Sequence, residues 1–503
     1  MEEFPIIYLR GYAGDQRGVE ATVDDPFYGF NTGSTHVRVG ERGQSEFFAF
    51  ESPVVRLMSD HRYEDVYSRG RQPSQERPGA SAPRPKSIWI HRYYDVTSES
   101  FDNSQGIRLE IEKIAQQLKQ TVTFVKELTG AKRVILVAHS MGGLIARCLI
   151  QKVYRDEAPN IEMPALAHID KVFTYGTPHG GIHFDVSGGD FLERARDWVG
   201  RNNMDDFGRT RMYEYLTPKS KRRKSVPKDF DELRNSLDGA FPPERFFCLV
   251  GTNAKDYEAA MGWSSKIVGP QSDGLVQIRH AYIKGSPRAY VHRAHSGRYG
   301  ILNSEEGYQN LRRFLFGDMR VELFLDKLDR LRDFPPESGV THQAEARVAI
   351  RRLPVLMHDQ TTEHHSPILL ELEKLRAGEP IPLFTVFLIP KEAPDERTCQ
   401  YGVVLGVHRE HRENGFLILR DHLEQVPLWR DELIVDLVQE APGTYTGRYA
   451  WRSSQRDPEA GPDQQLTWRG LDDRVEVRLR LPPRGRELLG DNAELLMRAS
   501  PWI

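Results

Sequence analysis

Short apolar segments alternate with longer segments of helical periodicity over the first two-thirds of the chain. The apolar segments predict strands at residues 5–9, 87–93, 133–138, 171–175, 246–250 and 289–292. Between residues 105 and 128, apolar side chains recur every three or four positions, the spacing of one helix face, and Gly130 marks the end of that helix. Residues 141–154 are expected to form the next helix. This alternation predicts an α/β fold with a mostly parallel sheet covered by helices.

Two long segments interrupt the alternation. Residues 68–87 are rich in Pro, Arg, Gly and Ser, a composition typical of a flexible insertion. Residues 180–245 separate two expected strands by far more than the usual short connection, so we interpret them as a lid or cap over a functional site. Residues 307–316 are expected to form a closing helix that stops at Gly317. These limits predict a first domain over residues 1–317.

Beyond residue 317, strand-like segments follow one another without helical segments between them. Gly, Pro and Asp separate these segments, as is typical of proteins built from short antiparallel strands. The expected strands are residues 384–389, 402–408, 416–419, 432–438, 445–451 and 474–481. We therefore expect residues 318–503 to form a β-rich accessory domain that resembles a sandwich.

The composition fits a globular protein and argues against several classes of partner. An apolar fraction of 39% and a charged fraction of 28% are ordinary for folded domains. The net charge of -3 creates no field that would attract nucleic acid, and basic and aromatic residues do not interleave as they do on nucleic-acid surfaces. No glycine-rich phosphate-binding motif follows an expected strand. We therefore expect no nucleic-acid partner and no cofactor.

Cysteine content and the N-terminal residues bear on localisation. Cys148, Cys248 and Cys399 are too few and too scattered for a disulfide framework or a zinc site, which is typical of a reducing compartment. The N-terminal residues are acidic where a secretory signal would be basic, and their apolar stretch is short. No segment reaches the roughly 18 consecutive apolar residues of a membrane span. We expect a cytoplasmic location, although export without a signal peptide would leave no trace in the sequence.

The candidate nucleophile is Ser140, which stands where an apolar strand ends and a helix is expected to begin. A serine at such a sharp turn projects above the sheet, and its strained backbone requires small residues two positions before and after it. Ala138 and Gly142 meet this requirement, although the common motif has glycine where this chain has Ala138. Gly143 allows the helix to pack closely. The alternative interpretation is a serine–glycine turn without activity.

A serine hydroxyl becomes a strong nucleophile only when a histidine takes its proton and a carboxylate orients that histidine. With a serine on a turn of this kind, the acid and then the histidine follow along the chain. Asp273 lies on a loop after the strand at 246–250, and its small, turn-forming neighbours favour it over Asp256. His295 lies farther into a loop than His292, which still belongs to an expected strand. We therefore favour Asp273 and His295, with Asp256 and His292 as the alternatives.

Two backbone N–H groups are expected to stabilise the oxyanion that forms when the serine attacks. One is the N–H of Met141, directly after the serine, and the other is the N–H of Tyr12, in the loop after the first strand. Gly11 would allow that loop to turn so that the Tyr12 N–H faces the site. The alternative is that Gly11 is an ordinary turn glycine.

Together these segments resemble the lipase branch of the α/β-hydrolase superfamily, within it the bacterial lipases and proteins related to GPI inositol-deacylases. The resemblance covers roughly residues 1–317 and rests on residues 138–143, 10–14, 175–181, 272–276, 295–297 and 301–303. The chain departs from the family pattern at Arg10, where histidine is usual, and this puts the surroundings of the oxyanion loop in doubt. The resemblance implies an α/β-hydrolase fold with a lid. We expect Gly11, His139 and His179 to line the site, and the resemblance implies that His179 is structural and is not the base.

The expected lid contains a basic cluster and several large apolar side chains. The cluster could press the lid transiently against anionic lipid headgroups, but we favour a solvated loop. The apolar side chains could contact acyl chains, and ordinary core packing explains them nearly as well. The basic residues are Lys219, Lys221, Arg222, Arg223 and Lys224, and the apolar ones are Phe184, Phe191, Leu192 and Trp198.

A histidine-rich segment in the second domain suggests a metal site at first sight. It contains His358, Glu363, His364 and His365. Adjacent histidines on an extended strand point to opposite faces, so they rarely share one ion. We therefore expect no metal site.

The sequence predicts a serine hydrolase that cleaves carboxylic esters through an acyl-enzyme, of the lipase or phospholipase type. A thioesterase, a peptidase or an acyltransferase on the same three residues is the first alternative. The second is an effector or interaction protein whose β-rich domain binds a protein partner or a membrane. The substrate headgroup, the acyl length, the oligomeric state and the role of residues 318–503 do not follow from the sequence.

Overall fold

The computed structural model describes most of the chain. The described segments are residues 3–11, 35–39, 45–49, 53–66, 84–91, 93, 110–182, 207–230, 236–256, 269–296, 299–332, 340–392, 398–412, 423–441, 444–455, 464–467 and 474–502. Tyr12, most of residues 68–87, the lid residues 183–206, and the strand expected at 416–419 lie outside these segments.

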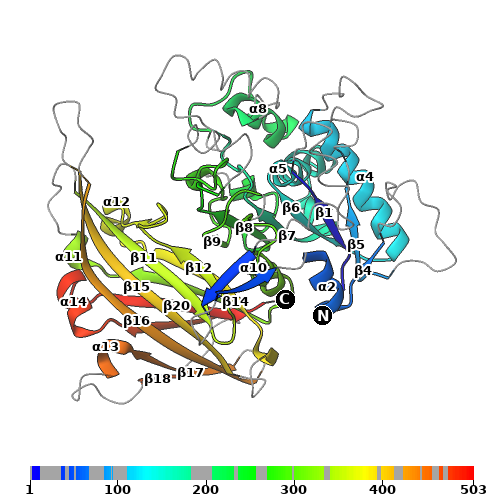
Figure 1. Cartoon of the computed structure of the whole chain (residues 1–503). Coiled ribbons are helices and arrows are strands. Elements are labelled where there is room, and N and C mark those ends of the chain that lie inside the picture. The colour runs from blue at the N-terminus through cyan, green and yellow to red at the C-terminus, as the bar shows by residue number, and fades with distance from the viewer. Residues whose placement is uncertain are drawn as a thin grey trace. The chain divides into compact units, whose positions relative to one another are not determined.

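A seven-stranded sheet forms the centre of the first part of the chain, in the order β4-β5-β1-β6-β7-β8-β9 (Figure 1). The pairs from β4 through β8 are parallel. The strands are β1 (Ile6–Leu9), β4 (Glu64–Asp65), β5 (Ser87–Ile90), β6 (Val134–His139), β7 (Ile169–Tyr175), β8 (Phe246–Gly251) and β9 (Arg288–Val291). All six strands predicted here from apolar runs are confirmed, and the predicted α/β architecture with them.

Strand β1 marks the place where the strand order reverses, because β5 lies on one side of it and β6 on the other. Ile6 pairs with Ile88 and with Ile135. Strands β1, β5, β6, β7 and β8 are buried along their whole length, as expected for strands covered on both faces. In open α/β sheets, ligands bind at the carboxyl ends of the strands next to such a reversal. The loops after β1 and β6 lie at that edge.

Helices α4 (Ile111–Thr129) and α5 (Met141–Cys148) pack against each other and against β6. The apolar face of α4 is buried at Ile111, Ile114, Leu118, Val122 and Val125, and Gly130 ends the helix in the left-handed conformation at φ 69°. The buried face of α4 and its end at Gly130 are both as predicted. The second predicted helix is confirmed with one difference: α5 passes through a π-helical turn at residues 149–153 before α6 (Tyr154–Glu157).

Among the described residues of the first part, the remaining α-helices and strands are two helices, a strand pair and one helix in the predicted lid. Helix α10 (Glu305–Phe316) is the predicted closing helix, and it is joined to α2 (Pro53–His61) by an ion pair of Arg56 with Glu305 at 3.0 Å. The Tyr175 hydroxyl on β7 donates to the carbonyl of Gly307 in α10. Strands β2 (Thr35–Val39) and β3 (Ser45–Ala49) form an antiparallel pair, and α8 (Arg209–Leu216) lies in the predicted lid segment.

The second part of the chain consists of two antiparallel sheets (Figure 1). One has the order β14-β10-β20-β19, and the other has the order β12-β11-β15-β16-β17-β18, with β13 paired to β11. The strands are β10 (Met319–Asp326), β11 (Val340–Ile350), β12 (Leu356–Gln360), β13 (Ile368–Leu369), β14 (Ile381–Leu388), β15 (Thr398–Arg412), β16 (Leu423–Ala441), β17 (Thr444–Trp451), β18 (Gln464–Thr467), β19 (Val475–Arg480) and β20 (Glu494–Pro501).

The two antiparallel sheets share one hydrophobic core. Side chains such as Leu323 of β10 and Val403 of β15 belong to a single buried cluster. The Tyr401 hydroxyl of β15 lies 3.0 Å from the sulfur of Met497 on β20, and its ring contacts Phe384 of β14. Two sheets facing each other across a common core form a sandwich-like arrangement, which confirms the predicted class.

Short helices interrupt the strands of the second part, where the sequence had suggested none. They are α11 (Asp329–Arg332), α12 (Leu372–Arg376), α13 (Arg452–Gln455) and α14 (Pro483–Leu489). Each is at most seven residues long, which is too short for a clear helical period in the sequence. The prediction of helix-free connections was therefore wrong in detail.

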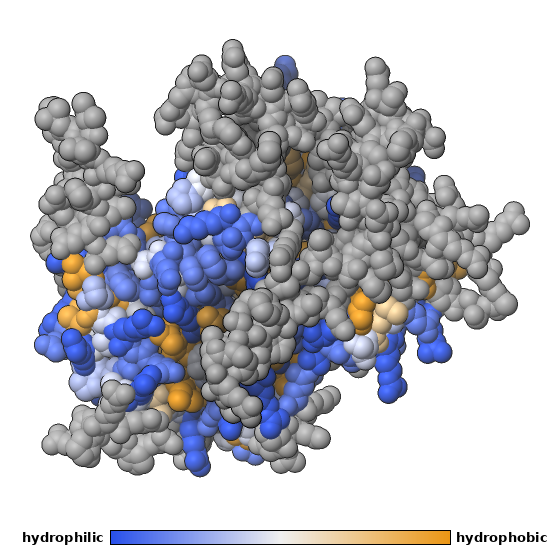
Figure 2. Space-filling view, viewed as in Figure 1, coloured by the Kyte–Doolittle hydropathy of each residue, from blue (hydrophilic) through white to orange (hydrophobic). Residues whose placement is uncertain are grey.

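The chain divides into two compact units, residues 1–288 with 292–308, and residues 289–291 with 309–503. No helix among the described residues is long and apolar enough to cross a membrane. In the same part of the chain the exposed large apolar side chains are isolated ones, at Met58, Ile161 and Leu369. The face seen in Figure 2 is correspondingly hydrophilic, with scattered hydrophobic patches over the described residues.

Candidate active site

Ser140 occupies a sharp turn between β6 and α5. Its backbone has φ 53° and ψ −127°, a combination that L-residues rarely adopt. The turn is fixed from several sides, because the Ser140 N–H donates to the carbonyl of Tyr175 and the Ser140 carbonyl accepts from the Thr177 hydroxyl at 2.9 Å. Strain of this kind persists only where the surroundings enforce it, and it is typical of functional sites.

Two glycines allow α5 to begin so close to the sheet. A Cβ atom on Gly142 would lie 2.5 Å from the carbonyl oxygen of Leu9, and a Cβ on Gly143 would lie 2.2 Å from the Thr177 hydroxyl oxygen. Neither distance is compatible with a side chain. The small residues after the serine are therefore required by the approach of the β1 and β7 ends to the turn.

Ser140, His295 and Asp273 form a continuous hydrogen-bonded chain. The Nε2 atom of His295 lies 3.1 Å from the Ser140 hydroxyl oxygen, and its Nδ1 atom lies 2.8 Å from a carboxylate oxygen of Asp273. His295 is 3% exposed and Asp273 is 1% exposed. Because an ionised carboxylate only accepts, the Nδ1–H of His295 donates to it, and Nε2 is left with a lone pair toward the serine.

The Asp273 side chain is held in one orientation by the backbone. Its second carboxylate oxygen accepts hydrogen bonds from the N–H groups of Leu275 at 3.0 Å and Val276 at 2.7 Å. A Cβ atom on Gly176 would lie 3.0 Å from the Asp273 carboxylate, and one on Gly251 would lie 2.8 Å from the Asp273 Cβ. The carboxylate therefore sits in a cradle that the two glycines keep open.

Asp256 and His292, the alternative acid and the alternative base, make other contacts. Asp256 accepts a hydrogen bond from the side-chain amide of Asn253 at 2.7 Å. His292 is exposed, and its Nδ1 atom lies 3.3 Å from the Thr252 hydroxyl oxygen. The structure thus brings together the residues that the sequence favoured, Ser140, Asp273 and His295. Their catalytic roles stay predictions.

His139 lies directly behind the candidate base. Its Nε2–H donates to the backbone carbonyl of His295 at 3.0 Å, and the two rings are 5.0 Å apart. Burial lowers the pKa of His139 to about 3, with further lowering from His295 and Arg10, against a smaller opposing effect of the hydrogen bond to His295. The imidazole of His139 is therefore neutral near physiological pH.

The predicted oxyanion donors are placed only in part. Met141 is the first residue of α5, directly after the serine. The loop after β1 passes close to the serine, because a Cβ atom on Gly11 would lie 2.9 Å from the Ser140 Cβ. Tyr12 lies outside the described residues. The assignment of its N–H as a donor stays a prediction.

His179 is fully buried beside β7. Its Nε2 atom lies 3.1 Å from the Thr174 hydroxyl oxygen, and its backbone carbonyl accepts from a guanidinium N–H of Arg147 at 2.6 Å. Burial, reinforced by the nearby Arg147, lowers the pKa of His179 well below its ordinary value. These contacts agree with the structural role that the sequence favoured. Its predicted place in the lining of the site is not tested by them.

Thr177 and Gly176 contribute to the site but were not singled out from the sequence. They belong to the segment 175–181 that carried part of the family resemblance. Thr177 holds the nucleophile turn through its hydroxyl, and Gly176, at φ 50°, passes close to His295. The glycine–threonine pair directly after the strand β7 was the sequence signal that could have identified them as part of the site.

Of the weaker sequence signals, the basic cluster and the histidine-rich segment lie within the described residues, and the apolar lid residues do not. The basic cluster at 219–224 is mostly exposed, and within it Lys221 forms an ion pair with Asp238 at 2.9 Å. In the histidine-rich segment, His364 lies 3.2 Å from Asp359, and His358 lies 3.1 Å from Gln360. No three His, Cys, Asp or Glu side chains in the described segments are placed to hold a metal ion.

Residues 89–200 match the family described as "Putative serine esterase (DUF676)". The match includes β6, Ser140 and α5, and it ends before Asp273 and His295. The sheet order and the strand–turn–helix at Ser140 give the first part of the chain an α/β-hydrolase-like fold, and the matched segment is similar to the serine-esterase family.

Several solved structures are similar to this chain at low identity. A lipase of Bacillus licheniformis is 12% identical, with a TM-score of 0.30, over 60% of this chain and 88% of the lipase. The product of a Listeria innocua gene is 14% identical, with a TM-score of 0.28, over 62% and 94% of the two chains. A Lactobacillus plantarum protein titled as a cell surface hydrolase is 14% identical, with a TM-score of 0.28, over 63% and 92%. No curated protein matches the sequence.

Proposed function

We propose that this protein hydrolyses carboxylic esters through an acyl-enzyme on Ser140, with His295 as the base and Asp273 as the carboxylate that orients it. The observation that carries the proposal is the hydrogen-bonded chain from the Ser140 hydroxyl through His295 to Asp273, at 3.1 and 2.8 Å. The strained turn at the serine supports it, since such a turn presents the hydroxyl above the sheet.

In the first half-reaction, His295 Nε2 takes the hydroxyl proton as the Ser140 oxygen attacks the ester carbonyl carbon. The tetrahedral intermediate then expels the alcohol, which leaves with the proton that His295 carried, and the acyl group remains on the serine. Asp273 stabilises the imidazolium that exists between these two proton transfers. Its backbone hydrogen bonds keep the carboxylate oriented throughout.

In the second half-reaction, water loses a proton to His295 and attacks the acyl carbonyl carbon. The carboxylic acid leaves, and His295 returns the proton to the Ser140 oxygen. Both tetrahedral intermediates carry an oxyanion, for which we assign the backbone N–H groups of Met141 and Tyr12. One such donor is worth roughly 3–4 kcal/mol of the activation barrier, so the loop after β1 matters almost as much as the three side chains.

We propose a lipid ester as the substrate, of the lipase or phospholipase type, on the family resemblance of segments 138–143, 175–181 and 272–276. We also keep residues 1–317 as the proposed catalytic domain, residues 180–245 as its lid, and residues 318–503 as an accessory domain. The chain needs no cofactor for this chemistry.

The test is the variant Ser140→Ala, assayed with short nitrophenyl esters and with a fluorophosphonate label. Hydrolysis and labelling should both be lost while the fold stays intact. The matched control is Ser286→Ala, because Ser286 is a buried serine whose hydroxyl has no hydrogen-bond partner among the described residues. Undiminished turnover in the Ser140 variant would refute the proposal.

A substrate panel separates the proposed esterase from its alternatives. The wild-type chain, with Ser140→Ala as the blank, is incubated with phospholipids, triglycerides, thioesters and peptides. The ester proposal requires that lipid esters lose acyl chains faster than thioesters or peptides are cleaved. If the wild-type chain reacts with no fluorophosphonate at all, the interaction-protein hypothesis replaces the enzyme.

A further inference from the structure

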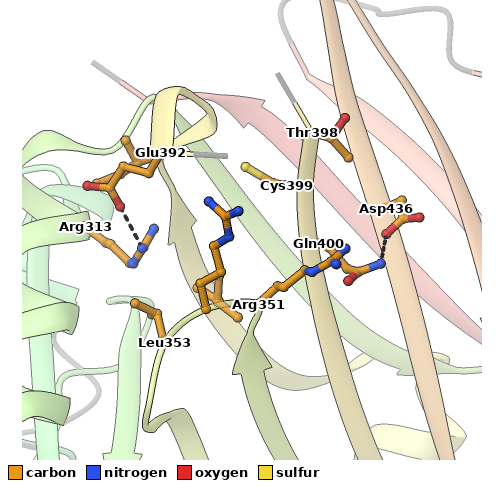
Figure 3. Close-up of a pocket in the computed structure, with 11 residues that line it drawn as sticks. Arg313, Arg351, Leu353, Glu392, Thr398, Cys399, Gln400 and Asp436 are labelled. Carbon is orange, nitrogen blue, oxygen red and sulfur yellow. Dashed lines mark hydrogen bonds and ion pairs between the residues drawn. The ribbon is translucent and has the colours of Figure 1, made fainter. Parts of the chain in front are cut away.

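The second unit contains a pocket of about 380 Å³ whose polar lining is dominated by arginine (Figure 3). Arg313 comes from α10, Arg351 and Arg352 come from the turn between β11 and β12, and Glu392 precedes β15. A cavity of this size accommodates a small molecule. Neither the proposed esterase chemistry nor the sequence motifs account for it.

Arg313 is a buried cation with an unused donor. Its side chain is 5% exposed, and one guanidinium N–H donates to Glu392 at 3.0 Å, while its Nε has no hydrogen-bond partner among the described residues. Burial lowers the pKa of Arg313, and Glu392 opposes that effect. A buried N–H without a partner is unfavourable, so an acceptor that enters the pocket and accepts this hydrogen bond would be stabilised here.

The turn between β11 and β12 presents two more guanidinium groups. Arg352 has φ 74°, a conformation that favours glycine and is uncommon for arginine. Among the described residues, no carboxylate forms an ion pair with Arg351 or Arg352. In Figure 3, Arg351 lies between Leu353 and Gln400.

The carboxylates that line the pocket are already engaged. Glu392 forms ion pairs with both Arg312 and Arg313. Asp436 accepts a hydrogen bond from the side-chain amide of Gln400 at 2.7 Å. The guanidinium groups of the turn therefore leave the pocket with an excess of positive charge and of N–H donors, which suits an anion.

The number and origin of the donors favour phosphate over carboxylate. One arginine fork satisfies both oxygens of a planar carboxylate, whereas a tetrahedral phosphate offers more acceptor oxygens to donors that come from separate elements. Apolar side chains of Ile350, Leu353 and Ile389 line the same pocket and provide surface for an organic group. We propose that this pocket binds a small phosphate monoester, with the phosphate on Arg313, Arg351 and Arg352.

The test is isothermal titration calorimetry on the full chain carrying Ser140→Ala, which keeps ester chemistry out of the measurement. The probes are phenyl phosphate, inorganic phosphate and benzoate, together with phosphatidylcholine vesicles with and without phosphatidic acid. Phenyl phosphate should bind more tightly than inorganic phosphate or benzoate. The vesicles should bind no better with phosphatidic acid than without it.

Two variants locate the binding. Arg351→Gln should weaken phenyl phosphate about tenfold, which corresponds to about 1.4 kcal/mol. Arg376→Gln, at an exposed position of α12 outside the pocket, should leave the affinity unchanged. The proposal is overturned if Arg351→Gln and the parent chain bind phenyl phosphate with equal affinity, or if neither phenyl phosphate nor inorganic phosphate binds. It is also overturned if benzoate binds more tightly than phenyl phosphate, or if only the vesicles that contain phosphatidic acid bind. None of these outcomes bears on the esterase proposal.

Discussion

The Nε2–H of His139 donates to the backbone carbonyl of His295 at 3.0 Å, so the residue before the candidate nucleophile also holds the candidate base. The His295 side chain is anchored independently through Asp273. Because burial keeps His139 neutral near physiological pH, it holds the loop without adding a charge next to the imidazolium that forms during catalysis. We assign His139 as a positioning residue.

Substituting His139 should lower turnover without changing substrate binding. His139→Ala removes one neutral hydrogen bond, worth about 1 kcal/mol, which corresponds to a loss of roughly fivefold to tenfold in kcat. His139→Gln should recover part of that loss, because its amide N–H can reach the same carbonyl. Steady-state kinetics check both, with KM expected to stay near the wild-type value. A variant with a lower Tm and an unchanged kcat would reduce His139 to a packing role.

Asp273→Asn should lower kcat by roughly four orders of magnitude. An amide in place of the carboxylate turns the His295 imidazole to the wrong tautomer, so that Nε2 carries a proton and cannot accept one from Ser140. Asp256→Asn is the matched control and should retain activity, since Asp256 contacts Asn253 instead. Nitrophenyl ester kinetics with both variants decide between them. The opposite ranking would transfer the acid role to Asp256.

Gly143→Ala should destabilise the fold by about 1–3 kcal/mol, because the new methyl group overlaps the Thr177 side chain. Thr177→Ala removes the two closest atoms, so the double variant should recover part of the loss, a coupling that a double-mutant cycle in urea measures. Gly402→Ala on β15 is the control, since its nearest neighbour would be 3.9 Å away. Simple additivity of the two single changes would contradict this account.

The sequence predicted the first part of the fold well, because each strand of a covered parallel sheet is a local apolar run. It also favoured Ser140, Asp273 and His295, whose side chains the structure brings together. It could not predict the cradle around Asp273, because Gly176 and Gly251 reach it from two different strand ends. Contacts between loops that are distant in sequence leave no periodic signal.

The second part of the fold was predicted in class but not in detail. Strand β10 alternates buried and half-buried residues along its whole length, a pattern that the sequence analysis missed. Its partner β20 lies far along the chain, with Met319 opposite Pro501, so no hairpin turn marks the pair. Strands β15 and β16 extend well beyond their apolar centres into polar ends. Tertiary pairing, which the sequence does not display, sets those ends.

His91 provides a test of the buried histidines in the first unit. It follows β5, and its Nδ1 atom lies 3.0 Å from the Thr121 hydroxyl oxygen on α4. The Thr121 hydroxyl donates to the carbonyl of Gln117, so Nδ1 of His91 is the protonated nitrogen, and its Nε2 has no partner among the described residues. Burial lowers the pKa of His91 from its usual 6.5 to about 4.

Stability should therefore fall as the pH drops from about 6.5 toward 4, because the unfolded chain binds a proton at His91 that the folded chain excludes. Above pH 6.5 the contribution of neutral His91 to the free energy of unfolding is fully present. Below pH 4, up to about 3 kcal/mol of that free energy is lost. His91→Gln does not titrate, so its urea midpoint should depend less on pH across this window than that of the wild type. His292→Gln, at an exposed position, should keep the wild-type slope. Parallel curves for wild type and His91→Gln would show that His91 is protonated in the folded chain as readily as in the unfolded one.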